Sequence, residues 1–258
     1  MEKVQDKKDL NFQLVSIIVP VYNERKTIGM IIERVQKTEI QKELIIVDDG
    51  STDGTREWLH ERFKQDSEDE EPSRKLSCRS FSDCSQVRVL THPYNQGKGA
   101  ALKTGFQQAK GSIVIVQDAD LEYNPEEYPR LLEPLLTDRA DVVYGSRMLG
   151  ASEGTWPLIS YLGNKSLTAL TNATTGLSLT DVWTGYKVFK KSVLEDLSLD
   201  TSGFDMELEL TVKVAQRKWR VVEVPVSYMA RGKTEGKKIR WRDGIQSIKT
   251  LWRYGHVS

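Results

Sequence analysis

Short apolar runs alternate with longer segments of helical spacing along most of this chain, and no other feature constrains its fold as strongly. Patterns typical of helices follow the first four runs, and after the first one Ile28, Ile31, Ile32 and Val35 recur on one helix face. Strands that are hydrophobic throughout and alternate with helices favour an α/β fold, in which a mostly parallel sheet carries helices on both faces. The apolar runs lie at residues 15–22, 43–49, 87–92, 113–118 and 140–146.

Composition divides the chain into three parts. Residues 1–13 form a charged tail, residues 14–230 a single domain, and residues 231–258 a basic loop followed by an amphipathic helix. Within the domain, residues 64–86 are rich in acids and serine, which indicates a solvated, mobile insertion. A docking loop is the less favoured alternative for that insertion.

Composition and charge exclude several classes of protein. The 37 basic and 37 acidic residues cancel, so no overall field favours nucleic acid. Cys78 and Cys84 have no histidine near them and fit neither a zinc site nor a disulfide framework, which favours a reducing compartment. No apolar run reaches the roughly 18 residues of a membrane-spanning helix, and the first residues do not fit a signal peptide. We therefore expect a cytoplasmic protein whose contact with any membrane is peripheral, at the cytoplasmic face.

Carboxylates follow two of the predicted strands directly. Asp48 and Asp49 end the second apolar run, and Asp118, Asp120 and Glu122 follow the fourth. Ligands of parallel sheets bind beyond the carboxyl ends of the strands, and carboxylate oxygens are the ligands that Mg²⁺ and Mn²⁺ prefer. A loop of solvated acids is the alternative, but the position after a buried strand favours a metal site.

Five segments follow one another in a characteristic order: SIIVPVYNERKTI, LIIVDDGSTDGT, NQGKGAALKTGFQQAKG, IVQDADLEYNPEE and VVYGSR. Together they resemble the family 2 glycosyltransferases, and within that family the dolichol- and polyprenyl-phosphate mannose or glucose synthases. The resemblance covers nearly all of the chain from residue 15 onward, apart from the acidic insertion. It implies the GT-A fold of nucleotide-diphospho-sugar transferases.

The resemblance assigns a donor site by position. Pro20, Tyr22 and Glu24 match residues that hold the base and ribose of a nucleotide sugar. Asp49 matches an acid that contacts the nucleotide. On this basis the donor binds at the ends of the first two strands.

The same resemblance assigns a metal site and a basic loop. Asp118, Asp120 and Glu122 match a D-x-D-x-Q/E pattern that binds a divalent cation, although the dolichol branch often has glutamine in place of Glu122. Arg231 and Lys237 match the basic pair of a closing loop that reaches the phosphates of donor and acceptor.

Further residues are expected at the reaction centre. Arg147 matches an arginine that lines the sugar-phosphate site, and in TDVWTGYKVF Lys187 stands where arginine is usual, so the charge is kept and the planar fork is lost. Asp181 or Glu207 is the candidate general base if the acceptor is a hydroxyl. If the acceptor is already an anion, Asp181 would orient the basic residues instead. Glu207 equally fits an acid favoured near a helix N-terminus.

Lys98 lies in NQGKG, which has a competing interpretation as a phosphate-binding loop. A P-loop requires Ser or Thr after the lysine, and a dinucleotide fingerprint requires a third glycine; both are missing here. We expect Gly97 and Gly99 to allow close approach to the nucleotide or close packing before a helix.

The resemblance, together with these residues, implies a metal-dependent, inverting transfer of a hexose, mannose or glucose, from GDP-mannose or UDP-glucose to polyprenyl or dolichyl phosphate. A phosphate acceptor is already an anion and needs no base, whereas the alternative, a glycan or small-molecule hydroxyl, does. A nucleotide-sugar-binding regulator without turnover is disfavoured, because a binder needs no groups that stabilise a leaving group.

The C-terminal segment favours a lipid acceptor. Trp241, Ile245, Ile248 and Trp252 recur on one helical face, and basic residues outnumber acids from residue 231 onward. Such a helix suits anionic lipid headgroups, and packing on the domain is the alternative. The flanking basic residues are Arg240, Arg242, Lys249 and Arg253.

Overall fold

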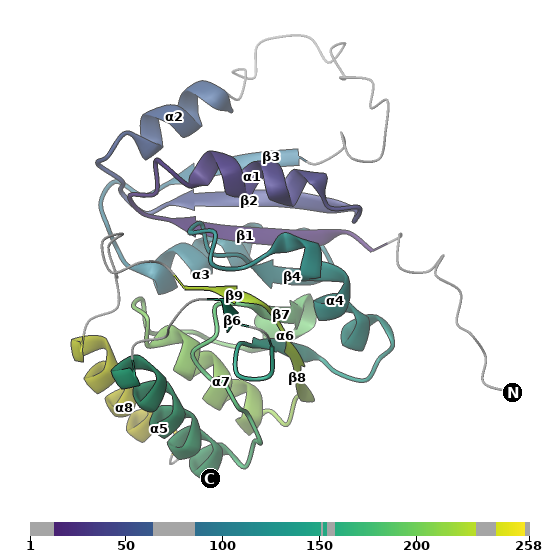
Figure 1. Ribbon diagram of the computed structural model, residues 1–258, viewed down its shortest axis with the longest axis vertical. Coiled ribbons are helices and arrows are strands. Elements are labelled where there is room, and N and C mark those ends of the chain that lie inside the picture. Colours follow the sequence, from purple (N-terminus) through teal and green to yellow (C-terminus); the bar gives the residue numbers. More distant parts are fainter. Residues whose placement is uncertain (1–12, 64–85, 151, 154–157, 231–240, 256–258) are drawn as a thin grey trace, which may run out of the picture.

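Among the residues that the structure describes, seven strands form one sheet in the order β3-β2-β1-β4-β7-β5-β8 (Figure 1). The computed structural model describes residues 13–63, 86–150, 152–153, 158–230 and 241–255. Strand β7 runs antiparallel to β4 and β5, and every other neighbouring pair is parallel. The strands of this sheet are β1 (Val15–Val21), β2 (Lys42–Asp48), β3 (Gln86–Thr91), β4 (Ile113–Val116), β5 (Val142–Ser146), β7 (Lys187–Lys190) and β8 (Val221–Pro225).

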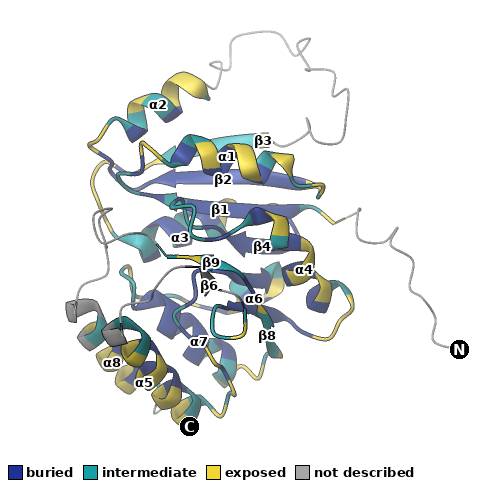
Figure 2. Ribbon diagram, viewed as in Figure 1, coloured by how far each residue is buried: buried dark blue, intermediate teal, exposed yellow. Residues whose placement is uncertain are grey.

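Helices cover both faces of the sheet, and their outer surfaces carry most of the exposed residues (Figure 2). A short parallel pair, β6 (Ser152–Glu153) and β9 (Tyr228–Met229), lies outside the main sheet. The helices are α1 (Ile28–Lys37), α2 (Thr55–Arg62), α3 (Lys98–Gln108), the 3₁₀ helix η3 (Pro125–Glu127), α4 (Tyr128–Leu136), α5 (Leu158–Thr175), α6 (Lys191–Asp196), α7 (Met206–Gln216) and α8 (Trp241–Tyr254).

Two hydrophobic clusters, one on each face, explain why the strands are apolar along their whole length. Ile17 of β1 belongs to the cluster that includes Ile31 of α1, and its neighbour Ile18 belongs to the cluster that includes Leu102 of α3. Because successive strand residues point to opposite faces, both positions must be apolar when helices cover both sides. The predicted α/β fold with a mostly parallel sheet is therefore confirmed.

The carboxyl ends of β1, β2 and β4 meet at one edge of the sheet, as their parallel register requires. Strand β7 enters between β4 and β5 in the opposite direction, with Val188 opposite Ile115. Its first residue, Lys187, consequently lies at that same edge. This one reversed strand brings the segment before it, from Asp181 onward, to the acids that follow β4.

Several predicted segments lie outside the described residues: most of the tail 1–13 and of the insertion 64–86, and the stretch 231–240 that contains Arg231 and Lys237. In the part of the chain that is described, no helix has both the length and the apolar character needed to cross a bilayer. Helix α8 forms as the sequence predicts and packs beside α5 and α7.

Candidate active site

The loops after β1 and β2 are tied to each other. Asn23, in the left-handed region with φ of 54°, receives a hydrogen bond on its side-chain oxygen from Thr52 N (2.8 Å), and its own N–H donates to Ser51 Oγ (2.9 Å). Glu24 is buried, its N–H donates to Thr55 Oγ1, and its carboxylate accepts from Thr27 Oγ1 (2.7 Å). These contacts hold the two loops together at the edge of the sheet where the nucleotide is predicted to bind.

The residues predicted to bind the nucleotide lie in and just after β1. Pro20 lies in β1 opposite Val47, and Tyr22 follows the strand, where it is partly exposed. Glu24 begins the turn that precedes α1, because Thr27 N and Ile28 N donate to its carbonyl oxygen (3.1 and 2.9 Å). The structure thus brings the three predicted residues to one strand end, and their contact with a nucleotide stays a prediction.

Asp49 is buried and fully engaged by protein donors. His92 Nδ1 lies 2.7 Å from Asp49 Oδ1 and donates to it, because an ionised carboxylate can only accept. The amides of Gln96 and Gly97 donate to its two oxygens at 2.9 and 2.8 Å. The second ring nitrogen of His92 bonds Thr104 Oγ1 (2.9 Å). Asp49 therefore holds the loop before α3 in place.

Asp118 lies at the end of β4 and forms an ion pair with Lys98. The Lys98 Nζ atom is 2.8 Å from Asp118 Oδ1 and 2.8 Å from Glu207 Oε1. A Cβ on Gly185 would overlap the other Asp118 oxygen, Oδ2. The glycine that precedes Tyr186 and Lys187 is thus the residue that lets the reversed segment approach the acids.

Asp120 and Glu122 continue the acidic segment through a strained turn. Leu121 between them has a φ of 64°, which a branched side chain adopts only where the surrounding structure imposes it. Asp120 Oδ1 accepts from Glu122 N (3.2 Å). The Glu122 carboxylate accepts from the Tyr228 hydroxyl (2.8 Å), and its carbonyl accepts from Met229 N. Glu122 therefore links the acidic segment to β9.

Arg147 and Asp181 form a two-pronged ion pair. Arg147 donates to Asp181 through Nε (2.7 Å) and a terminal nitrogen (2.8 Å), and also to the Trp183 carbonyl. Asn164 donates to Asp181 Oδ1 as well. Burial alone would raise the pKa of Asp181, but the hydrogen bonds and charge of Arg147 outweigh it and hold that pKa below its ordinary value. Asp181 is a weak base in this setting.

Lys187, the first residue of β7, is buried. Its Nζ atom donates to the carbonyls of Val182 (3.1 Å) and Thr184 (2.5 Å) and lies 3.4 Å from Glu207 Oε2. Burial lowers the pKa of Lys187. For Lys98 burial acts in the same direction, but Asp118 and Glu207 outweigh it and raise the pKa above its ordinary value. Glu207 thus has two ammonium partners.

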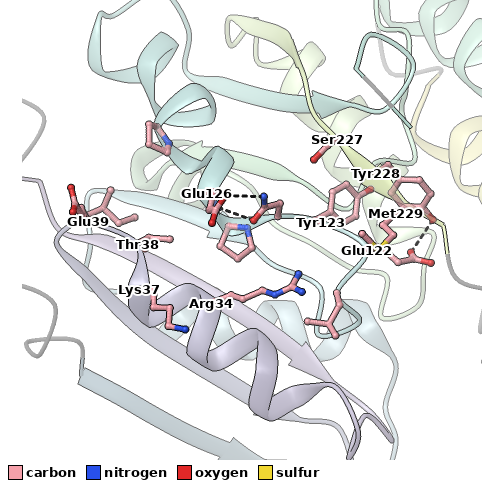
Figure 3. A pocket seen from close by; sticks show the side chains of 15 residues that line it. Arg34, Lys37, Thr38, Glu39, Glu122, Tyr123, Glu126, Ser227, Tyr228 and Met229 are labelled. Carbon is pink, nitrogen blue, oxygen red and sulfur yellow. Dashed lines mark hydrogen bonds between the residues drawn. The ribbon is translucent and has the colours of Figure 1, made fainter. Parts of the chain in front are cut away.

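A cavity of about 820 Å³ lies beside the acidic segment, between α1, residues 121–129 and β9 (Figure 3). Glu122 belongs to its wall, whereas Asp118 and Asp120 do not. Arg34 and Lys37 contribute basic side chains to it from α1. The labelled lining residues in Figure 3 are Arg34, Lys37, Thr38, Glu39, Glu122, Tyr123, Glu126, Ser227, Tyr228 and Met229.

Asp118, Asp120 and Glu122 are the residues predicted to bind a divalent cation, and their part in metal binding stays a prediction. Within the described ranges, no group of three or more His, Cys, Asp or Glu side chains is arranged to hold a metal ion. Asp118 and Asp120 nevertheless offer hard carboxylate oxygens at a strand end, and Mg²⁺ commonly takes one or two carboxylates and completes its shell with substrate phosphates. The residues present therefore fit a cation that binds together with a diphosphate.

The sequence does not predict the contacts that two residues at this edge make, although Lys98 itself lies in the NQGKG motif. His92 and Lys98 contact acids that lie 43 and 109 positions away in the chain, so no local spacing reveals either pair. The glycines around Lys98 gave the available signal. In the structure they pack against Ser202 and Gly203, which is one of the two roles expected for them.

An open α/β sheet with acids beyond its carboxyl edge is typical of enzymes that bind nucleotides there. Residues 16–198 match the family model described as Glycosyl transferase family 2. The chain belongs to this family and is a glycosyltransferase, which confirms the resemblance seen in its motifs.

The chain is similar to curated relatives over most of its length. It is 32% identical over 234 residues to the undecaprenyl-phosphate mannosyltransferase of Micrococcus luteus, with 86% of each chain covered. It is 30% identical over 239 residues to the polyprenol monophosphomannose synthase of Mycolicibacterium smegmatis, covering 88% of this chain and 83% of that one. A dolichol-phosphate mannosyltransferase of Pyrococcus furiosus is 29% identical over 244 residues, and the match covers 93% of this chain and 63% of the relative.

Solved structures agree with the fold. The glucosyl-3-phosphoglycerate synthase of Mycobacterium tuberculosis, in complex with Mn²⁺, UDP and glucosyl-3-phosphoglycerate, matches with a TM-score of 0.68 and 21% identity. That match covers 96% of this chain and 82% of the other. At this identity the likeness shows the fold alone, and it confirms the predicted α/β transferase architecture.

Proposed function

We propose that this protein transfers a hexose, mannose or glucose, from a nucleoside-diphosphate sugar to polyprenyl or dolichyl phosphate. Its relative in Micrococcus luteus is named an undecaprenyl-phosphate mannosyltransferase, and its relative in Mycolicibacterium smegmatis a polyprenol monophosphomannose synthase. The reaction is a single displacement with inversion: the acceptor phosphate oxygen bonds to the anomeric carbon while the bond to the diphosphate oxygen breaks.

The engagement of both candidate bases is the observation that supports a phosphate acceptor. Asp181 is fixed by Arg147 and Asn164, and Glu207 is held by Lys98 and Lys187. A hydroxyl acceptor requires a general base within reach, whereas a lipid phosphate is an anion before it reacts. Among the residues described, the site supplies ordered cations more readily than a free carboxylate base.

A divalent cation, Mg²⁺ or Mn²⁺, would be held by Asp118 and Asp120. When bound, it supplies Lewis-acid stabilisation of the charge on the departing diphosphate. In the structure Lys98 places an ammonium beside Asp118, and Asp181 orients the guanidinium of Arg147. Preoriented cations cost no reorganisation at the moment when the leaving group takes up charge.

We also propose a peripheral membrane contact through α8, at the cytoplasmic face of a membrane. Ile248 and Trp252 are 51% and 75% exposed, while Leu251 on the other side of the helix is buried against the domain. Lys249 and Arg253 are exposed next to them. An apolar strip flanked by cations complements anionic headgroups. Helix α5, which packs beside α8, adds exposed leucines at 162 and 170.

Liposome sedimentation tests this contact. Replacing Ile248 and Trp252 with serine should weaken binding to vesicles of anionic lipid, with the free energy of unfolding unchanged within about 0.5 kcal/mol, as expected for exposed positions. Met30→Ser, which removes an exposed side chain from α1, is the matched control. Equal vesicle binding by the double variant and the control would refute the contact.

The transfer itself is tested with labelled donors. GDP-mannose and UDP-glucose are offered separately, each with polyprenyl phosphate and with soluble glycan acceptors. We expect label in the organic phase, as a sugar-phosphate lipid, with one of the donors. Label that appears only on soluble hydroxyl acceptors would contradict the proposed acceptor.

A further inference from the structure

Lys98 is a nearly buried ammonium at the centre of the site that the family motifs leave without a function. It bridges Asp118 and Glu207 at 2.8 Å each, and its side chain is 15% exposed against 19% for Asp118. The ring of Phe204 lies 6.0 Å from the ammonium. An ammonium in this position has little contact with water and depends on the two carboxylates.

The backbone that carries Lys98 is fixed. Asp49 accepts from the amides of Gln96 and Gly97, and Ala100 N donates to the Ser202 carbonyl (3.0 Å). Gly97 has a φ of 100°, and a Cβ there would overlap Ser202 O. The movable part of this segment is therefore the flexible stem of Lys98, which can swing its charge without moving the loop.

The two carboxylates depend on Lys98 to different degrees. Glu207 has a second cation, Lys187, at 3.4 Å. Among the residues described, the ion-pair partner of Asp118 is Lys98. If Lys98 moves away, Glu207 remains compensated and Asp118 requires another positive charge. A divalent cation at the acidic segment would need the same Asp118 oxygens.

We propose that Lys98 takes the place of the divalent cation at Asp118 while the donor site is empty, and that it transfers its charge to the donor diphosphate when both bind. The inference rests on the proposed cation site at Asp118 and adds a competitor to it. The nucleoside diphosphate offers Lys98 a new partner, so the binding of nucleotide and of cation is positively coupled.

Mn²⁺ binding in the absence of nucleotide tests the competition. Free Mn²⁺ is followed by electron paramagnetic resonance in titrations of the wild-type protein and of Lys98→Met. The variant should bind Mn²⁺ about tenfold more tightly, between the effects typical of exposed and of buried ion pairs. Lys103→Met, on the same helix but contacting the carbonyls of residues 199 and 200, should bind like the wild type. Unchanged or weaker binding by Lys98→Met would overturn the inference.

The coupling gives a second readout. Addition of GDP or UDP should tighten Mn²⁺ binding by a larger factor in the wild type than in Lys98→Met, because the variant has no ammonium to relocate. Equal factors in the two proteins would contradict the transfer of charge. Should Lys98→Met fail to fold, Lys98→Gln, which is polar but uncharged, serves in both titrations.

Asp118→Asn separates this inference from the proposed function. It should abolish the gain in Mn²⁺ affinity that Lys98→Met produces, because the two residues act on one site. Wild-type Mn²⁺ affinity in Asp118→Asn would refute the cation site itself. Loss of binding in Asp118→Asn together with no gain in Lys98→Met would refute only the role of Lys98.

Discussion

Two strands of the sheet end in aspartates, and the two ends differ in what surrounds them. At the end of β2, Asp49 is held by His92 and by two backbone amides, all of which are fixed. At the end of β4, Asp118 is held by the flexible side chain of Lys98. Donors that cannot move make an acid part of the frame, whereas a movable partner leaves its acid available to a ligand.

The first prediction concerns the acids that follow β4, Asp118 and Asp120, and has the largest expected effect. Asp120→Ala should lower the rate of hexose transfer by about 10²- to 10³-fold, the range for loss of a charge-stabilising contact, and the residual rate should no longer respond to Mn²⁺. Transfer of labelled sugar to polyprenyl phosphate, measured across Mn²⁺ concentrations, provides the check.

Glu126→Ala is the matched control for Asp120→Ala, since it removes an exposed acid from the same segment. It should leave both the rate and its response to Mn²⁺ unchanged. A fully active Asp120→Ala variant would show that the acids after β4 are not where the cation binds.

Asp181 extends the comparison to an acid whose cationic partner is rigid. Asp181→Asn leaves the nearly buried guanidinium of Arg147 without its counter-charge, which should lower the free energy of unfolding by about 3 kcal/mol at pH 7. Because the folded-state pKa of Asp181 is lowered, this contribution is fully present above the unfolded pKa of about 3.9. It disappears as the pH falls from there through the folded-state pKa.

Urea denaturation of the wild type and of Asp181→Asn over a range of pH measures this difference in stability. We expect the gap between the two proteins to be constant near neutral pH and to narrow below about pH 4. A gap that does not change with pH would show that the charge of Asp181 is not what stabilises the fold.

Asp49→Asn tests the pair that Asp49 forms with His92 at the end of β2. The amide nitrogen of the new side chain would face one of the groups that now donate a hydrogen bond to Asp49. Because two donors cannot pair, the free energy of unfolding should fall by about 2 kcal/mol. Denaturation by urea gives the value, with the exposed Glu57→Gln on α2 as a control of equal charge change. A loss of less than about 0.5 kcal/mol, the scatter of ordinary surface changes, would argue against a framework role.

The smallest expected effect concerns Glu122. If its carboxylate serves the Tyr228 hydroxyl, Tyr228→Phe and Glu122→Ala should each lower the free energy of unfolding by about 1 kcal/mol, and the two losses should not add. Mn²⁺ affinity should stay within about twofold in both variants, well below the roughly 10- to 100-fold loss that follows when even an outer-shell partner of a metal ligand is altered. Selective loss of Mn²⁺ binding in Glu122→Ala would instead support the third-ligand role that the motif implies.

Much of the fold follows from local pattern, and the site follows less completely. The spacing from Ile28 to Val35 predicts α1, and the wholly apolar Ile17–Val19 stretch predicts a strand covered on both faces; both are observed. The reversal of β7 has no local signature, because Val188 and Phe189 would suit either direction. That reversal brings Lys187 to the edge of the sheet where the acids lie.

Charge pairing is the other feature of the site that the sequence does not predict. A motif gives the identity of Asp49 or Lys98, but the pKa and the accessibility of a charged group depend on partners brought in by the fold. Both His92 with Asp49 and Lys98 with Glu207 join residues far apart in the chain. Spacing along the sequence therefore locates the acids at the sheet edge. It does not show that Asp49 has fixed partners while Asp118 has a flexible one.

One titration tests the central distinction most directly: Mn²⁺ binding, in the presence of GDP or UDP, to Asp118→Asn and to Asp49→Asn under conditions where both are folded. The account predicts that Asp118→Asn loses Mn²⁺ binding, while Asp49→Asn binds Mn²⁺ like the wild type despite its lower stability. Retention of binding by Asp118→Asn together with its loss in Asp49→Asn would contradict the account.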